Sequence, residues 1–129
     1  IDLSGEYGTS VAGELSLRES GAILKRCACF VGNDSGPMHM AAAVGIPVVE
    51  VSCHPDGGMT EHPNAPERFG PYGVAQAVCR PKEAAHPCSR ACESNAPHCI
   101  LNVDVDCVVH ALEGMMVNSE EVGDMKTST

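Results

Sequence analysis

The residues best suited to chemistry in this chain are Asp34, Ser35, Gly36 and His39, which lie close together in the sequence. They supply a carboxylate, a hydroxyl, an unhindered backbone amide and an imidazole. Residues 37–44 are rich in alanine and begin with a proline, which is tolerated in a first helical turn because its missing N–H has no partner there. The start of such a helix has unpaired N–H groups and the positive end of the helix dipole, so the cluster predicts a phosphate site.

The same turn has a simpler interpretation. An Asp-Ser-Gly sequence before a helix is also typical of an ordinary N-cap that binds no ligand. A single histidine, too, is more often structural than functional. His39 falls in the first helical turn, three residues past Gly36, and can therefore point over the same opening as Asp34. We favour ligand binding because four suitable groups gather at one helix end.

These residues need a strand before the turn and another after the helix. Residues 28–32 and 47–52 are apolar runs of strand character, and Gly45 separates the helix from the second run. The second run is almost continuously apolar, as a buried parallel strand should be, although Glu50 interrupts it. That carboxylate is either at an exposed strand end or paired. Turns of this kind lie at the carboxyl ends of parallel strands, where α/β proteins bind ligands.

Further elements follow from capping signals and hydrophobic spacing. Ser16 and Glu19 have the spacing of a capping box, which predicts a helix over residues 17–26 with Leu17, Gly21 and Leu24 on one stripe. Residues 74–78 read as a short strand, and residues 100–103 as a candidate for one more. The last helix is expected over residues 104–116.

Asp104 and Asp106 have two interpretations. They match an Asp-x-Asp pattern by which some enzymes hold a divalent metal, but two acidic residues before an amphipathic helix are better explained as a cap and a first-turn charge. The loop over residues 53–73 is long for a compact domain. Its His54, His62 and Arg68 either face the opening beside Asp34 or belong to a solvated surface loop.

The chain has eight cysteines, yet it lacks the small, loop-rich character of secreted disulfide scaffolds, so we expect reduced thiols. Cys88, Cys92 and Cys99 form a C-x3-C-x6-C pattern with His86 and His98 nearby. Zinc sites usually show two close pairs of ligands, and only one such pair is recognisable here. A structural metal and a disulfide stay open, but we favour free thiols and assign no metal site and no cofactor.

Composition excludes several classes of function. The net charge of −9 argues against nucleic acid as a partner, because that binding needs Lys and Arg to neutralise phosphates. No run of about 18 apolar residues is present, so no membrane span is expected. The length of 129 residues corresponds to one domain at most.

Residues 31–43, followed by residues 45–49, resemble the signature of the heptosyltransferase family, glycosyltransferases of lipopolysaccharide core biosynthesis. Residues 68–73, the cysteine-bearing segment 87–99 and the last helix support the resemblance by their order, so that it covers roughly residues 21–116. It implies an α/β fold, namely a Rossmann-like parallel sheet forming part of the C-terminal half of a GT-B glycosyltransferase. It also implies a cytoplasmic protein at the inner face of the inner membrane.

The resemblance further implies a role for each residue of the cluster. Ser35, Gly36, Met38 and His39 would give backbone N–H groups to the diphosphate of ADP-heptose. Asp34 would accept hydrogen bonds from sugar hydroxyls, and the His39 side chain would bind a phosphate oxygen or steady the leaving ADP. Transfer would invert the anomeric centre and need no metal, while the catalytic base and the lipid-linked saccharide acceptor would belong to an N-terminal domain.

We therefore expect residues 1–117 to be a partial nucleotide-sugar-binding domain and residues 118–129 a disordered tail. Such a fragment would be inactive alone, and its exposed sheet edge would allow self-association. Two alternatives remain: a non-catalytic α/β binding or assembly module, and a zinc-binding module built on the three cysteines.

Overall fold

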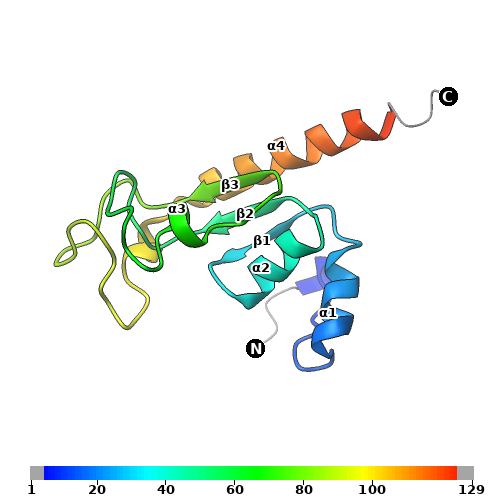
Figure 1. Cartoon of the computed structure of the whole chain (residues 1–129), viewed down its shortest axis with the longest axis horizontal. Helices are drawn as coiled ribbons and strands as arrows, with labels where there is room; N and C mark the ends of the chain where they lie inside the picture. Colours follow the sequence, from blue (N-terminus) through cyan, green and yellow to red (C-terminus); the bar gives the residue numbers. More distant parts are fainter. Residues whose placement is uncertain (1–4, 125–129) are drawn as a thin grey trace.

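The fold is built around a parallel sheet of three strands in the order β1-β2-β3 (Figure 1). The computed structural model describes residues 5–124. The strands are β1 (Phe30–Asn33), β2 (Val48–Val51) and β3 (Gln76–Cys79). Glu50 in the central strand is in register with Gly32 on one side and Val78 on the other. The expected α/β class with a Rossmann-like parallel sheet is confirmed.

Helices α2 (Gly36–Ala43) and α4 (Val105–Asp124) cover opposite faces of this sheet. Val48 belongs to a core cluster with Met38 and Ala41 of α2. Side chains alternate along a strand, so Val51 points to the opposite face from Val48. Cys79 is in register with Val51, and the Cys79 side chain contacts Cys107 of α4. The central strand is therefore buried on both sides, as its apolar sequence predicts.

Helix α1 (Leu17–Leu24) packs against α2 and begins with the predicted capping box. The Ser16 Oγ accepts a hydrogen bond from the Glu19 backbone N–H, and the Glu19 carboxylate accepts one from the Ser16 backbone N–H at 2.8 Å. The predicted apolar stripe is wrong at Leu17, whose side chain is exposed, whereas Gly21 packs against Met40. A first-turn residue lies at the free end of the helix, where the neighbouring helix does not cover it.

Two other predicted elements differ from the structure. Residues 100–103 are not a strand, because a 3₁₀ helix, η2 (Cys99–Asn102), occupies this segment. Helix α4 continues to Asp124 rather than ending near Met116, so the predicted tail begins too early. The rest of that tail, residues 125–129, lies outside the described residues. The remaining short elements are η1 (Gly5–Tyr7) and α3 (Pro66–Phe69).

The long loops after β2 and β3 lie together beyond the carboxyl ends of the strands (Figure 1). The Met59 backbone N–H donates a hydrogen bond of 2.8 Å to the Arg90 carbonyl, and the Asp56 N–H donates one of 2.9 Å to the Pro81 carbonyl. These bonds join the two loops. Within residues 5–124, no helix combines the length and apolar character that crossing a membrane requires.

Candidate functional site

Asp34 and His39 form the contact predicted at the start of α2. Asp34 follows β1 directly and His39 lies in the first turn of α2, and the intervening turn places Asp34 Oδ1 3.3 Å from His39 Nε2. Their side chains remain 34% and 47% exposed, respectively. A carboxylate and an imidazole therefore meet at the helix end and stay accessible to a ligand.

The first turn of α2 offers fewer free amides than the sequence predicted. The His39 N–H donates to the Ser35 carbonyl at 3.3 Å, and Met38 is fully buried in the core. The His39 N–H is therefore already engaged within the helix, and the Met38 side chain serves the core. Gly36 is exposed, and its N–H has no hydrogen-bond partner among residues 5–124. The Ser35 hydroxyl donates to the Asn33 carbonyl at 3.1 Å instead of capping the helix.

A cleft of about 250 Å³ opens beside this turn. Its walls come from the ends of β1 and β2 and from the two long loops: Asn33, Asp34, Val51, Ser52, Cys53, His54, Asn64, Cys92, Ser94 and Ile100. Of the predicted binding residues Asp34 lines the cleft, whereas Ser35, Gly36, Met38 and His39 do not. The cleft lies at the carboxyl ends of parallel strands, the usual ligand position in α/β folds.

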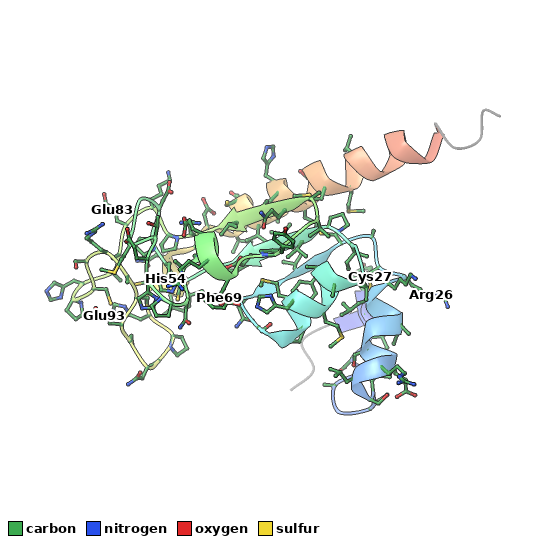
Figure 2. All side chains as sticks on the ribbon, in the orientation of Figure 1. Arg26, Cys27, His54, Phe69, Glu83 and Glu93 are labelled. Carbon is green, nitrogen blue, oxygen red and sulfur yellow. The ribbon has the colours of Figure 1, made fainter. Side chains whose placement is uncertain are left out.

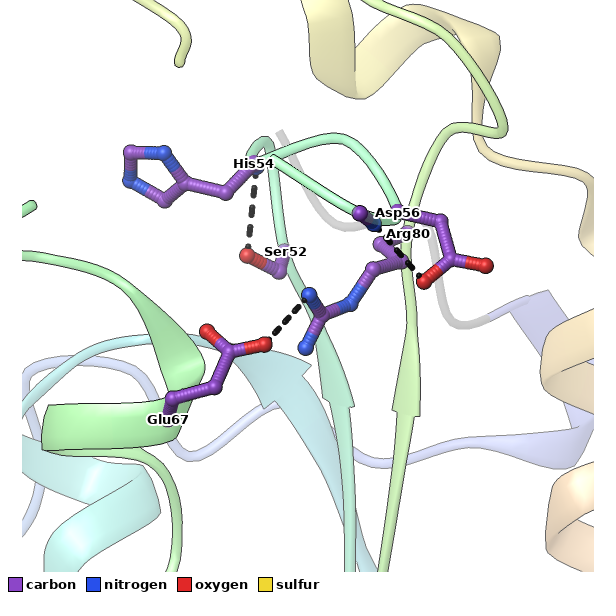
Figure 3. Close-up of polar contacts among 6 residues, drawn as sticks. Ser52, His54, Asp56, Glu67 and Arg80 are labelled. Carbon is purple, nitrogen blue, oxygen red and sulfur yellow. Dashed lines mark hydrogen bonds and ion pairs between the residues drawn. The ribbon is translucent and has the colours of Figure 1, made fainter. Parts of the chain in front are cut away.

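His54 lies inside the cleft wall, although the sequence left its position open. It is 6% exposed, and its backbone N–H donates to the Ser52 hydroxyl at 3.2 Å (Figure 3). Its ring lies 4.6 Å from that of His62, and its buried Nδ1 has no hydrogen-bond partner within residues 5–124. Burial lowers the pKa of His54, and the neighbouring His62 and Arg80 lower it further. His54 is therefore a neutral imidazole at physiological pH. Arg68, by contrast, is exposed and donates to the Glu61 carbonyl.

Glu50 is a buried carboxyl group without a hydrogen-bond partner. It is 1% exposed, and both carboxylate oxygens are unpaired among the described residues. It is thus neither at an exposed strand end nor hydrogen-bonded, the two alternatives that the sequence suggested. Burial raises the pKa of Glu50 and the charge of Asp34 raises it further, while Arg80 and His39 oppose this rise. Such a perturbed carboxyl group near a cleft is typical of functional sites.

Arg80 places a positive charge near Glu50 and His54. Its guanidinium donates to Glu67 Oε1 at 2.8 Å, which ties α3 to the residue after β3 (Figure 3). Its side chain is 17% exposed, so this ion pair is largely shielded on the arginine side. The sequence did not single out Arg80, because only the fold brings it near Glu50 and His54.

A second group of side chains gathers in the loop after β3. One ligand atom from each of Cys88, Cys92, His98 and Cys99 lies within 4.8 Å of all the others. The sequence pointed to the three cysteines but treated His98 only as a neighbour. His98 directly precedes Cys99 and so lacks the spacing that zinc ligand pairs usually show, and only the fold reveals it as a fourth possible ligand.

The predicted cap at the start of α4 is confirmed. Asp104 Oδ1 accepts a hydrogen bond of 3.0 Å from the Asp106 backbone N–H. Since a cap oxygen typically bonds the second or third helical N–H, this contact explains the Asp-x-Asp pattern without a metal.

Comparison with known proteins adds the family context. The model of the family described as "Glycosyltransferase family 9 (heptosyltransferase)" matches residues 2–98. The chain is also 37% identical over 54 residues to lipopolysaccharide heptosyltransferase 3 from Escherichia coli. That match covers 42% of this chain and 14% of the relative. No solved structure matches the chain.

Proposed function

The chain belongs to glycosyltransferase family 9, the heptosyltransferases, and on this premise we propose that the start of α2, beside the cleft, holds the sugar diphosphate of a nucleotide-sugar donor. The donor proposed is ADP-heptose, and the reaction is transfer of heptose to a lipid-linked saccharide of the lipopolysaccharide core. This chain would supply the donor half of the site. Its match to the heptosyltransferase relative spans 14% of that protein. From the family resemblance, the acceptor site and the catalytic base would belong to an N-terminal domain.

The observation that carries this proposal is the Asp34–His39 contact at the start of α2, beside the cleft. The exposed Gly36 N–H is a free donor at the positive end of the helix dipole, where a phosphate oxygen is stabilised. His39 adds a second donor to the same anion when its Nε2 carries a proton. Both groups matter because the chain carries a net charge of −9, which disfavours an anionic ligand at long range.

The remaining roles follow from the positions of the polar groups. Asp34 faces the cleft and would accept hydrogen bonds from sugar hydroxyls. The Ser35 hydroxyl would turn from the Asn33 carbonyl to a phosphate oxygen. As the glycosidic bond to the diphosphate breaks, negative charge grows on the departing phosphate, and the Gly36 amide and His39 would stabilise it most at that stage. The Met38 side chain packs in the core, so only its backbone N–H would take part in binding.

Titration of the chain with ADP, followed by amide NMR, tests this proposal. The Ser35 and Gly36 amides should shift on titration, and ADP-heptose should shift Asp34 as well. Asp34→Ala should weaken ADP-heptose binding, and His39→Ala ADP binding, about tenfold or more, since a hydrogen bond to a charged group contributes about 1.5–3 kcal/mol.

Asp106→Ala and His110→Ala are matched controls, because both residues are exposed on α4 on the other face of the sheet. These variants should bind ADP like the parent chain. Unchanged spectra in the presence of ADP, together with a native circular dichroism spectrum, would contradict the proposal and favour a non-catalytic binding or assembly module.

A further inference from the structure

We propose that Cys88, Cys92, His98 and Cys99 form a structural zinc site that fixes the loop after β3. All four lie between β3 and the end of η2, in the segment that walls one side of the cleft. Three of the residues are half-buried and Cys99 is fully buried. This inference does not depend on the proposed donor binding.

The ligand atoms already have the spacing of a tetrahedral site. His98 Nδ1 lies 3.6 Å from Cys88 Sγ and 3.3 Å from Cys99 Sγ. With Zn–S bonds of about 2.3 Å and Zn–N bonds of about 2.0–2.1 Å, tetrahedral geometry places a sulfur and a nitrogen ligand about 3.5–3.6 Å apart. Mutual distances within 4.8 Å leave room for one ion. An iron–sulfur cluster distributes its thiolates over several irons and holds them farther apart.

The orientation of the His98 ring is the strongest single feature. Its Nε2 lies 3.1 Å from the His86 carbonyl, which can only accept a hydrogen bond, so Nε2 carries the proton. The Nδ1 lone pair is then free and faces the sulfur atoms. Metal-bound histidines usually donate their second ring N–H to a carbonyl or carboxylate in this way, which fixes both the tautomer and the ring.

Backbone N–H groups around the sulfur atoms favour thiolates. The Glu93 N–H donates to Cys88 Sγ at 3.5 Å. Thiolate is the form that binds a metal.

The donor set selects zinc among common metals. Three thiolates and one imidazole in a compact tetrahedron suit zinc, whereas magnesium and calcium prefer oxygen ligands. Four protein ligands fill the coordination sphere, as in structural rather than catalytic zinc sites. The site would hold in place the segment carrying Cys92 and Ser94, which line the cleft.

Metal analysis of the purified, reduced 129-residue chain tests the inference. We expect one zinc per chain by elemental analysis. Cobalt(II) replacing zinc should give the intense visible bands of a tetrahedral site and a thiolate charge-transfer band. Cys99→Ser should weaken zinc binding by more than about 100-fold in competition with a chromophoric chelator, beyond the 10–100-fold typical of groups outside the ligand set.

Two variants separate ligand loss from misfolding. His98→Cys keeps four ligands, so it should retain one zinc per chain while its cobalt bands shift toward those of an all-thiolate site. Cys27→Ser is the matched control, because Cys27 lies at the far end of the molecule from Glu93 and the cysteine loop (Figure 2). Absence of cobalt bands in the reduced parent chain would overturn the inference, as would unchanged zinc binding in Cys99→Ser. A disulfide between two of these cysteines under reducing conditions would also overturn it.

Discussion

Arg80 and Glu67 are joined by an ion pair of 2.8 Å that links α3 to the residue following β3. Residues 70–75 and the whole of β3 lie between them, so this pair fixes α3 to the carboxyl end of β3. The hydrogen bond from Arg80 lowers the pKa of the Glu67 carboxyl group, and a hydrogen bond from the backbone N–H of Glu67 itself lowers it further. The folded state therefore favours ionised Glu67.

The first prediction concerns the pH dependence of this pair. A lowered folded-state pKa gives stability that is present above the unfolded pKa of about 4.3 and is lost as the pH falls through the folded value. Because Glu67 is 39% exposed, solvent screening limits its contribution, and Glu67→Gln should reduce the free energy of unfolding by about 0.5 kcal/mol at pH 7. Urea unfolding should show this loss at pH 7 and none below about pH 3. An equal loss at both pH values would mean that the pair's charge is not responsible.

The second prediction concerns Glu50, whose pKa is shifted in the opposite direction. Burial has the largest effect and raises the pKa of Glu50, and the charge of Asp34 raises it further. Arg80 and His39 lower it by smaller amounts. A carboxyl group whose pKa is raised in the folded state is most compatible with folding below its unfolded pKa. Stability is lost as the pH rises through the folded pKa, because the buried group must then ionise. Glu50→Gln should therefore gain stability relative to the parent chain between pH 4 and pH 8, by about 1.4 kcal/mol for each unit of pKa shift. A stability difference that does not change with pH would show that Glu50 stays ionised.

The sequence predicted the central unit of the fold because its signals are local. Pro37 marks the start of α2, and Gly45, whose φ is +88°, follows its end. The apolar run at Val48 and Val49 is buried in the sheet. The capping box at Ser16 was likewise readable from residue spacing. Such signals depend on a few neighbouring residues, and tertiary contacts did not override them.

The parts that sequence reasoning missed depend on contacts between distant segments. Arg80 approaches Glu50 only after β2 and β3 pair, and His54 is buried only because the two loops meet. The packing of the Met38 side chain in the core was missed for a related reason, since only the fold brings it against Val48. His98 was overlooked as a ligand because it precedes Cys99 directly instead of standing at the usual spacing of two to four residues.

The third prediction tests the close approach of Gly70 to α3. A Cβ added there would lie 2.5 Å from the Pro66 carbonyl oxygen and 3.3 Å from Glu50 Oε2. Since the first of these atoms is backbone, α3 would have to move, and Gly70→Ala should cost about 1–3 kcal/mol of unfolding free energy. Gly114→Ala is the control: a Cβ there meets nothing within 4 Å, and alanine in a helix should stabilise the chain by up to about 1 kcal/mol. Equal stabilities for the two variants would contradict the packing around Gly70.

The fourth prediction separates the core from the binding cluster. Met38 is adjacent to His39, yet it is fully buried and packs with Ala41 and Val48, whereas His39 is exposed beside Asp34. Met38→Ala should therefore lower the free energy of unfolding by about 2–5 kcal/mol, because it removes buried volume that the core cannot refill. Met38→Leu conserves volume and should cost less than about 1.5 kcal/mol while leaving ADP binding unchanged. His39→Ala should do the reverse, with little change in stability and weaker ADP binding. Urea unfolding and ADP titration of the three variants would show the separation, and a loss of ADP binding in stable Met38→Leu would place Met38 in the site after all.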